Sequence, residues 1–92
     1  MDTTPQGKSR IHQNYAVLLL HTGRADLAIE QGLRAVELDP TAKSYETLAF
    51  AQFKAGRTAD AVRTLRQAVA RHPDRKELAL RLKQLEASNP TR

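Results

Sequence analysis

The sequence repeats itself at a fixed distance of 33 residues, the separation of Gly23 and Gly56. At this offset the segment HTGRADLAI (21–29) returns as KAGRTADAV (54–62). A fixed period of roughly 20 to 50 residues is typical of solenoids, in which each repeat is one supersecondary unit stacked on the next. The repeat therefore restricts the fold more than any other feature of the chain.

Each copy has the pattern of a helix, a glycine turn, a second helix and a proline stop. Apolar and alanine side chains recur at i, i+3, i+4 and i+7 on both sides of the glycine, which is the spacing of one helical face. Proline lacks an amide hydrogen and clashes with the preceding turn, so Pro40 and Pro73 end the second helix of each copy. Four helices are expected, at 8–21, 25–38, 42–54 and 58–71.

A fifth helix is expected at 75–87. Asp74 precedes Glu77 by three residues, an arrangement typical of a capping box at a helix N-terminus. Charged residues separate the leucines of this segment, so one face is apolar and the other polar. A polar outer face is what the terminal helix of a repeat array needs. The apolar face consists of Leu78, Leu82 and Leu85.

These elements predict an all-α fold, an α-solenoid of two helix-turn-helix repeats with a capping helix. With four aromatic residues and no tryptophan, the core must come from aliphatic side chains and alanine. We expect a single domain at 8–88, preceded by a disordered segment at 1–7 and followed by a frayed tail at 89–92. Within the domain, repeat one spans about 9–41, repeat two about 42–74 and the capping helix about 75–87.

The two copies share an ordered set of residue types: a bulky residue, a large–small pair, and later two alanines and a proline. In the second copy these are Tyr45, Leu48, Ala49, Ala61, Leu65, Ala68 and Pro73, and in the first they are Tyr15, Ala16, Leu19, Ala28, Ala35 and Pro40. The pattern resembles that of the tetratricopeptide repeat family. The chain departs from it at His12, Gly32 and Gln52.

The resemblance implies a concave groove, lined by the first helix of each repeat, that holds peptides or partner helices. A second stripe on these helices provides the candidate partner-binding residues. They are Gln13, Val17, Leu20 and His21 in repeat one, and Glu46, Phe50, Phe53 and Lys54 in repeat two. We expect Val17 and Phe50 to point into the groove. Leu20 and Phe53 lie either near it or between neighbouring first helices.

One groove type known in this family grips a carboxylate through Lys, Asn and Arg on the first helices. The matching positions hold Gln13, Val17 and Thr47, so the asparagines are missing. The sequence disfavours such a clamp.

The sequence predicts no catalytic residues, no metal site and no cofactor site. His12, His21 and His72 form no pair at i, i+4, and the chain has no cysteine. No serine stands near an activating base, and no glycine-rich phosphate-binding motif is present. His12 falls on the packing stripe, where we expect a hydrogen-bonded interior residue. The chain is not expected to be an enzyme.

The net charge of +5 is unevenly distributed. Residues 1–46 contain five basic and six acidic residues, whereas residues 47–92 contain ten basic and four acidic ones. The basic half leaves nucleic acid or another anionic partner as an alternative, although no aromatic residue interleaves with the arginines, which disfavours nucleic acid.

The function expected first is a protein-interaction scaffold that binds a peptide or helix of another protein in the groove. Self-association is the other alternative, either as a homo-oligomer or as a fragment of a longer array, because stable arrays usually need about three repeats. The longest apolar run, YAVLLL at 15–20, is far shorter than the roughly 20 residues of a membrane span. With no cysteine and no signal-peptide pattern at its start, the chain is expected to be cytoplasmic.

Overall fold

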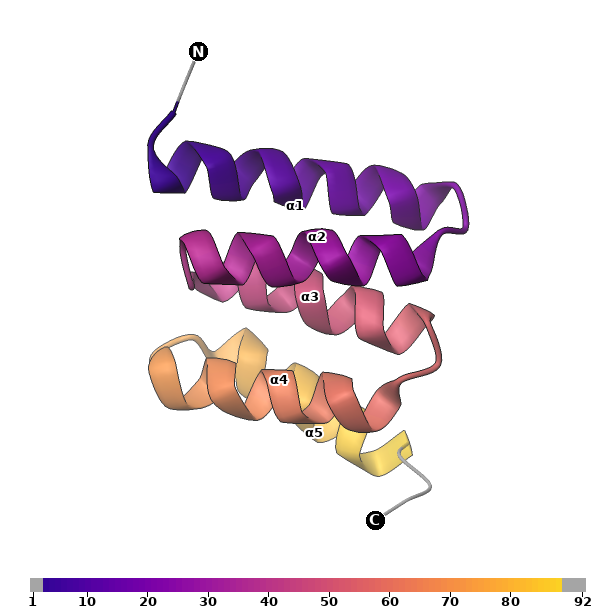
Figure 1. The fold of residues 1–92 in the computed structure, drawn as a ribbon. Helices are drawn as coiled ribbons and strands as arrows, with labels where there is room; N and C mark the ends of the chain where they lie inside the picture. Colours follow the sequence, from indigo (N-terminus) through magenta and orange to yellow (C-terminus); the bar gives the residue numbers. More distant parts are fainter. Residues whose placement is uncertain (1–2, 89–92) are drawn as a thin grey trace.

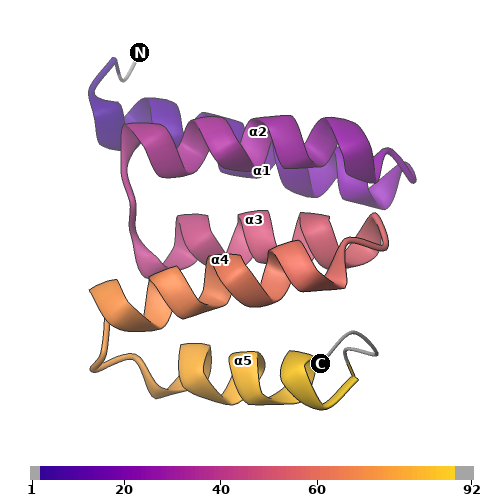
Figure 2. The same cartoon turned by 60° about the horizontal axis from the view of Figure 1, so that its bottom comes forward.

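The computed structural model describes residues 3–88, which form five α-helices joined by short turns. Each helix packs against the next one in the chain (Figure 1). Figure 2 shows the helices as successive layers, the pair α1–α2, the pair α3–α4 and then α5. The helices are α1 (Pro5–His21), α2 (Ala25–Leu38), α3 (Ala42–Lys54), α4 (Thr58–Arg71) and α5 (Lys76–Ser88). The predicted two-repeat solenoid with a fifth, terminal helix is confirmed.

The first helix begins three residues earlier than the sequence analysis predicts. Thr4 is its N-cap, and the hydroxyl of Thr4 accepts a hydrogen bond from the amide of Gly7 at 3.0 Å. Pro5 follows at the first helical position, where the missing amide hydrogen has no cost. The expectation of disorder is therefore wrong for residues 5–7, which are helical, while residues 1–2 and the expected tail at 89–92 lie outside the described range.

The last helix begins at Lys76, one residue later than expected. The amide of Arg75 donates to the carbonyl oxygen of His72 at 3.1 Å, so a turn takes up the residue expected as N-cap, Asp74. In place of the expected capping box, a carboxylate oxygen of Glu77 accepts a hydrogen bond from Arg75 Nε at 2.6 Å.

The two glycine turns have the same construction. Gly23 and Gly56 adopt φ values of 76° and 81°, in the left-handed region that other residues enter at a cost. After Gly23, the amide of Arg24 donates to the carbonyl of Leu19 at 2.8 Å, and the equivalent bond from Arg57 in repeat two has the same length. These bonds satisfy the last carbonyls of the first helix in each repeat.

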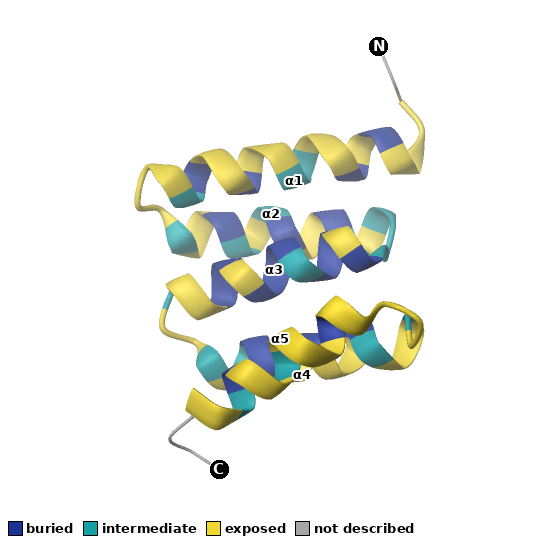
Figure 3. Cartoon of the chain, turned by 180° about the vertical axis from the view of Figure 1, so that it is seen from behind, coloured by how far each residue is buried: buried dark blue, intermediate teal, exposed yellow. Residues whose placement is uncertain are grey.

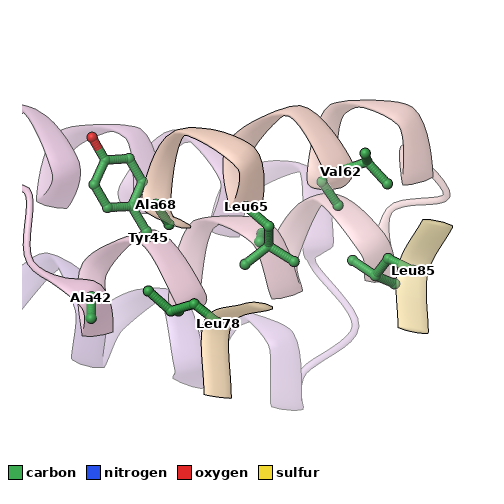
Figure 4. Close-up of a cluster of buried hydrophobic side chains, with 9 residues drawn as sticks. Ala42, Tyr45, Val62, Leu65, Ala68, Leu78 and Leu85 are labelled. Carbon is green, nitrogen blue, oxygen red and sulfur yellow. The ribbon is translucent and has the colours of Figure 1, made fainter. Parts of the chain in front are cut away.

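The core is unevenly divided between the repeats (Figure 3). The larger cluster joins repeat two to α5, and Figure 4 shows fully buried Leu65 at its centre. The smaller cluster joins repeat one to α3 and consists mainly of alanines, whose small side chains let helices approach closely. The larger cluster contains Ala42, Tyr45, Ala49, Ala61, Val62, Leu65, Ala68, Leu78 and Leu85, and the smaller contains Ala16, Leu19, Ala28 and Ala51.

Candidate interaction site

A pocket of about 260 Å³ opens between α3 and α5, with Leu65 of α4 among its lining residues. Its remaining walls combine three apolar side chains and one glutamate of α3 with a mixed set from α5. This volume is slightly below the roughly 300 Å³ at which small-molecule pockets begin, and suits one or two side chains of a partner. The lining residues are Glu46, Ala49, Phe50, Phe53, Leu65, Arg81, Gln84, Leu85 and Ser88.

The pocket lies where the spacing between helices changes. Between the two repeats, α2 and α3 approach closely because Gly32 has no side chain, and a Cβ placed there would lie 2.9 Å from the Cα of Leu48. One repeat further along, the 33-residue offset replaces Gly32 by Leu65 and Leu48 by Arg81. Thus α4 has a large side chain where α2 has none, and α4 contacts α5 less extensively than α2 contacts α3.

Three of the eight predicted partner-binding residues line this pocket. Phe50 and Phe53 are 43% and 41% exposed, and Glu46 is half-buried beside them. The exposure expected for Phe50 is therefore confirmed, and Phe53 remains accessible instead of filling the space between first helices. Lys54 does not line the pocket, but its Nζ lies 5.5 Å from the centroid of the Phe50 ring. This cation–π contact places a positive charge beside an aromatic pocket residue.

The predicted residues of repeat one lie elsewhere. Val17 is 44% exposed, as expected, while His21 is exposed in the last turn of α1. Leu20 is half-buried and packs against the smaller core cluster, which is the packing role that the sequence left open for it. The side-chain amide of Gln13 donates from Nε2 to the hydroxyl of Ser9 at 3.1 Å. The structure thus divides the predicted set, because the pocket between α3 and α5 is lined by predicted residues of repeat two and by none of those from repeat one.

The residues contributed by α5 were not among the predicted site residues. Arg81 was expected on the polar outer face of the capping helix, and no role was predicted for Gln84 or Ser88. The repeat offset contains a signal that could have identified two of them. It aligns buried Leu48 and Ala51 with Arg81 and Gln84, so the apolar pair that packs one layer on the next is absent from α5.

The pocket contains one acidic and one basic side chain, Glu46 and Arg81. Within residues 3–88, neither takes part in an ion pair. The ion pairs of the described chain lie outside the pocket, between Asp60 and both Arg57 and Arg63, between Arg66 and Glu86, and between Arg75 and Glu77. Arg81 is thus available to pair with a carboxylate of a bound partner.

Two histidines connect helices rather than forming a chemical site. His12 is half-buried, and its Nδ1 lies 2.6 Å from Oε1 of Gln31, which joins α1 to α2 as an interior hydrogen bond of the expected kind. The Nε2–H group of His72 donates to the carbonyl oxygen of Pro40 at 2.9 Å, across the boundary between the repeats. Among the described residues, no group of three His, Asp or Glu side chains is placed to hold a metal ion. That part of the chain also lacks a helix long and apolar enough to cross a membrane.

Comparison with protein families agrees with this geometry. Two models of the tetratricopeptide repeat match the chain, one over residues 8–43 and the other over residues 42–85. The two matches meet at the start of α3, where the structure passes from the first helix pair to the second. No curated protein matches the chain. Tetratricopeptide repeats are generally protein-interaction modules, and this chain belongs to the tetratricopeptide repeat family, with two repeats followed by a terminal helix.

Proposed function

We propose that the chain is a non-enzymatic interaction module that binds a peptide or helix of another protein across α3 and α5. The observation that supports this most directly is the pocket itself, with two half-exposed phenylalanines beside an apolar floor. Large aromatic side chains on a monomer surface leave apolar area that a partner can bury. The family membership supports the same general role.

The chemistry of the pocket suggests how a partner would be held. One large apolar side chain of the partner would enter between Phe53 and Leu85, and burying such a side chain contributes about 1.5–3 kcal/mol. Anchors of this kind commonly supply most of the binding energy of an interface. The polar groups of Glu46, Arg81 and Gln84 would orient the partner backbone and its flanking side chains.

The test begins with a library of displayed helical peptides selected against the wild-type chain. Affinities of the selected peptides are then measured by fluorescence anisotropy on four proteins: the wild type, the double variant Phe50→Ser and Phe53→Ser, and the single variants Val17→Ser and Leu80→Ser. Leu80 is the matched control, because it is exposed and apolar but does not line the pocket.

We expect the double variant to weaken binding at least tenfold, and Leu80→Ser to leave it unchanged. Circular dichroism melting of each variant separates loss of binding from loss of fold. Equal binding to the double variant and the wild type would place the site elsewhere. A loss with Val17→Ser would extend the site onto α1, as the sequence pattern predicts.

A further inference from the structure

The outer side of α1 presents a stripe of large apolar side chains. Ile11, Tyr15 and Leu18 are 56%, 49% and 58% exposed. They occur at i, i+4 and i+7, so they lie on one face of the helix. Helix α1 lies at one end of the stack of described helices (Figure 1), and most of its residues are exposed (Figure 3). Within the described chain, this face is therefore not covered by another helix.

The second repeat shows what such a face does when it is covered. The 33-residue offset carries Ile11, Tyr15 and Leu18 onto Ser44, Leu48 and Ala51. These three are 0%, 4% and 0% exposed. They are buried because α2 packs on this side of α3, where a Cβ placed on Gly32 would lie 2.9 Å from the Cα of Leu48. The stripe on α1 thus corresponds to the helix-packing face of α3, and no other helix of residues 3–88 covers it.

The two faces differ in the size of their side chains. On α3, serine and alanine flank Leu48 and allow the close approach of α2. On α1, isoleucine and leucine occupy the flanking positions and tyrosine the centre. Bulky side chains keep a second helix further away and fill the gap by interdigitation, so the stripe favours a helix with a bulky stripe of its own.

The stripe is complementary to itself. Ile11 and Leu18 are equally distant from the midpoint between Asn14 and Tyr15. A two-fold axis at this midpoint brings Ile11 of one copy against Leu18 of a second copy, in an antiparallel pair of helices. An interface of this kind is isologous, with the same patch used by both copies.

Charge also permits this pairing. Within about one turn of the axis the ionisable side chains are Tyr15 and His12, and half-buried His12 is held inside the repeat, with its Nδ1 2.6 Å from Oε1 of Gln31; α1 contains no acidic residue. In the antiparallel register, Lys8 of one copy lies beside His21 of the other. The two Lys8 residues of the dimer are then about 20 Å apart along the helix axis. That separation exceeds the screening length of about 8 Å at physiological salt.

We propose that Ile11, Tyr15 and Leu18 form the centre of a homodimer interface in which α1 packs antiparallel against α1 of a second copy. The three half-exposed side chains supply on the order of 300 Å² of apolar surface per copy. A standard interface buries about 800 Å² per partner, so this smaller centre, even with a polar rim, is expected to give a weak and reversible dimer. The pocket lies between α3 and α5, at the other end of the stack, and remains open in the dimer. Two pockets on one particle would raise the avidity for a repetitive partner.

The first test is sedimentation equilibrium of the full chain between about 1 and 500 μM. The decisive variant is Leu18→Glu, and its matched control is Leu80→Glu, which changes an equally exposed leucine (59% against 58%) on α5. We expect a monomer–dimer equilibrium for the wild type and for Leu80→Glu, and a monomer throughout for Leu18→Glu. Circular dichroism at low concentration should give the same helix content for all three.

A wild type that stays monomeric at every concentration overturns the proposal. A dimer that survives Leu18→Glu overturns it as well, and so does an assembly that grows beyond two copies, which would indicate head-to-tail stacking.

A second test addresses the antiparallel arrangement. The chain has no cysteine, so a single introduced thiol reports on one position. Asn14→Cys places that thiol beside the axis without altering the apolar stripe, and Leu80→Cys places it at the far end. Under mild oxidation we expect the first variant to form a disulfide-linked dimer many times faster than the second. Equal rates would overturn the arrangement.

Discussion

The two repeats of this chain share one pattern and differ in what surrounds them. Within residues 3–88, nine large apolar side chains are exposed, of which six belong to repeat one and two to repeat two. Repeat two lies between α2 and α5 and contributes most of the larger core, whereas one side of repeat one has no neighbour among the described residues. Burial in this fold therefore depends on the place of a repeat in the stack as much as on its residues.

The comparison is clearest at two pairs of equivalent positions. Tyr15 and Leu48 match in the repeat, yet the first is half-exposed and the second is buried. Gly32 and Leu65 also match. Gly32 lies where α2 and α3 cross closely, whereas Leu65 lines the pocket. The same repeat pattern thus leaves a side chain exposed at one place and buries its equivalent at another.

The largest effect is expected at the centre of the repeat-two core. Leu65→Ala removes a fully buried side chain that packs in the larger cluster, and it should lower the free energy of unfolding by about 2–5 kcal/mol. Urea denaturation followed by circular dichroism measures the loss. A cost below about 1 kcal/mol would mean that α5 closes onto α4 when the leucine is removed, and the pocket would then be a consequence of Leu65 alone.

A substitution at the equivalent glycine should reverse the usual effect of alanine in a helix. Gly32→Ala places a Cβ 2.9 Å from the Cα of Leu48 and should cost about 1–3 kcal/mol by overpacking. At an unobstructed helical position the same change stabilises by roughly 0.5–1 kcal/mol. A lower urea midpoint for Gly32→Ala would therefore indicate overpacking, and a higher midpoint would indicate that the position is unobstructed. Adding Leu48→Ala should restore little, since the obstructing atom belongs to the backbone.

The two turn glycines should behave alike. Gly23→Ala and Gly56→Ala each force a side chain into the left-handed region, at about 1–2 kcal/mol. A Cβ at either position would meet no atom within 4 Å, so the cost comes from the backbone alone. Thermal melts of the two variants should give similar losses. A clear difference between them would show that the repeats do not unfold as one cooperative unit.

The smallest effect concerns the start of α5. The pKa of Glu77 is lowered by a hydrogen bond to its own backbone amide and then by the guanidinium of Arg75. A carboxyl whose pKa falls on folding stabilises the fold above its unfolded pKa, and this contribution is lost as the pH falls through the folded pKa. NMR titration of the side-chain carboxyl should show a pKa below the ordinary value, and Arg75→Ala should raise it partway back. An unchanged titration in Arg75→Ala would mean that the exposed ion pair contributes nothing.

Much of this architecture is predictable from local sequence. The bounds 25–38, 42–54 and 58–71 follow from helical periodicity and from glycine and proline at fixed places, and the structure confirms them. The exposure of Val17 and Phe50 agrees with the groove-facing position that the resemblance to the family implies for them. The start of α1 was missed because Thr4 and Pro5 act as an N-cap and first helical residue ahead of the apolar stripe, where periodicity carries no signal.

The place of the pocket depended on tertiary structure. The pocket depends on how neighbouring helices approach each other. Gly32 allows α2 to lie close to Leu48 of α3, whereas Leu65 and Arg81, at the equivalent positions, line the pocket. It also required the neighbour of each helix, since Leu20 packs into a core while Phe53, on the same stripe, remains open. By itself, the sequence determined which segments are helices and how often the unit recurs, because periodicity, glycine turns and proline stops act within a few residues. Only the tertiary structure decided which apolar faces are covered, because that depends on side chains from other layers meeting across the helix crossings.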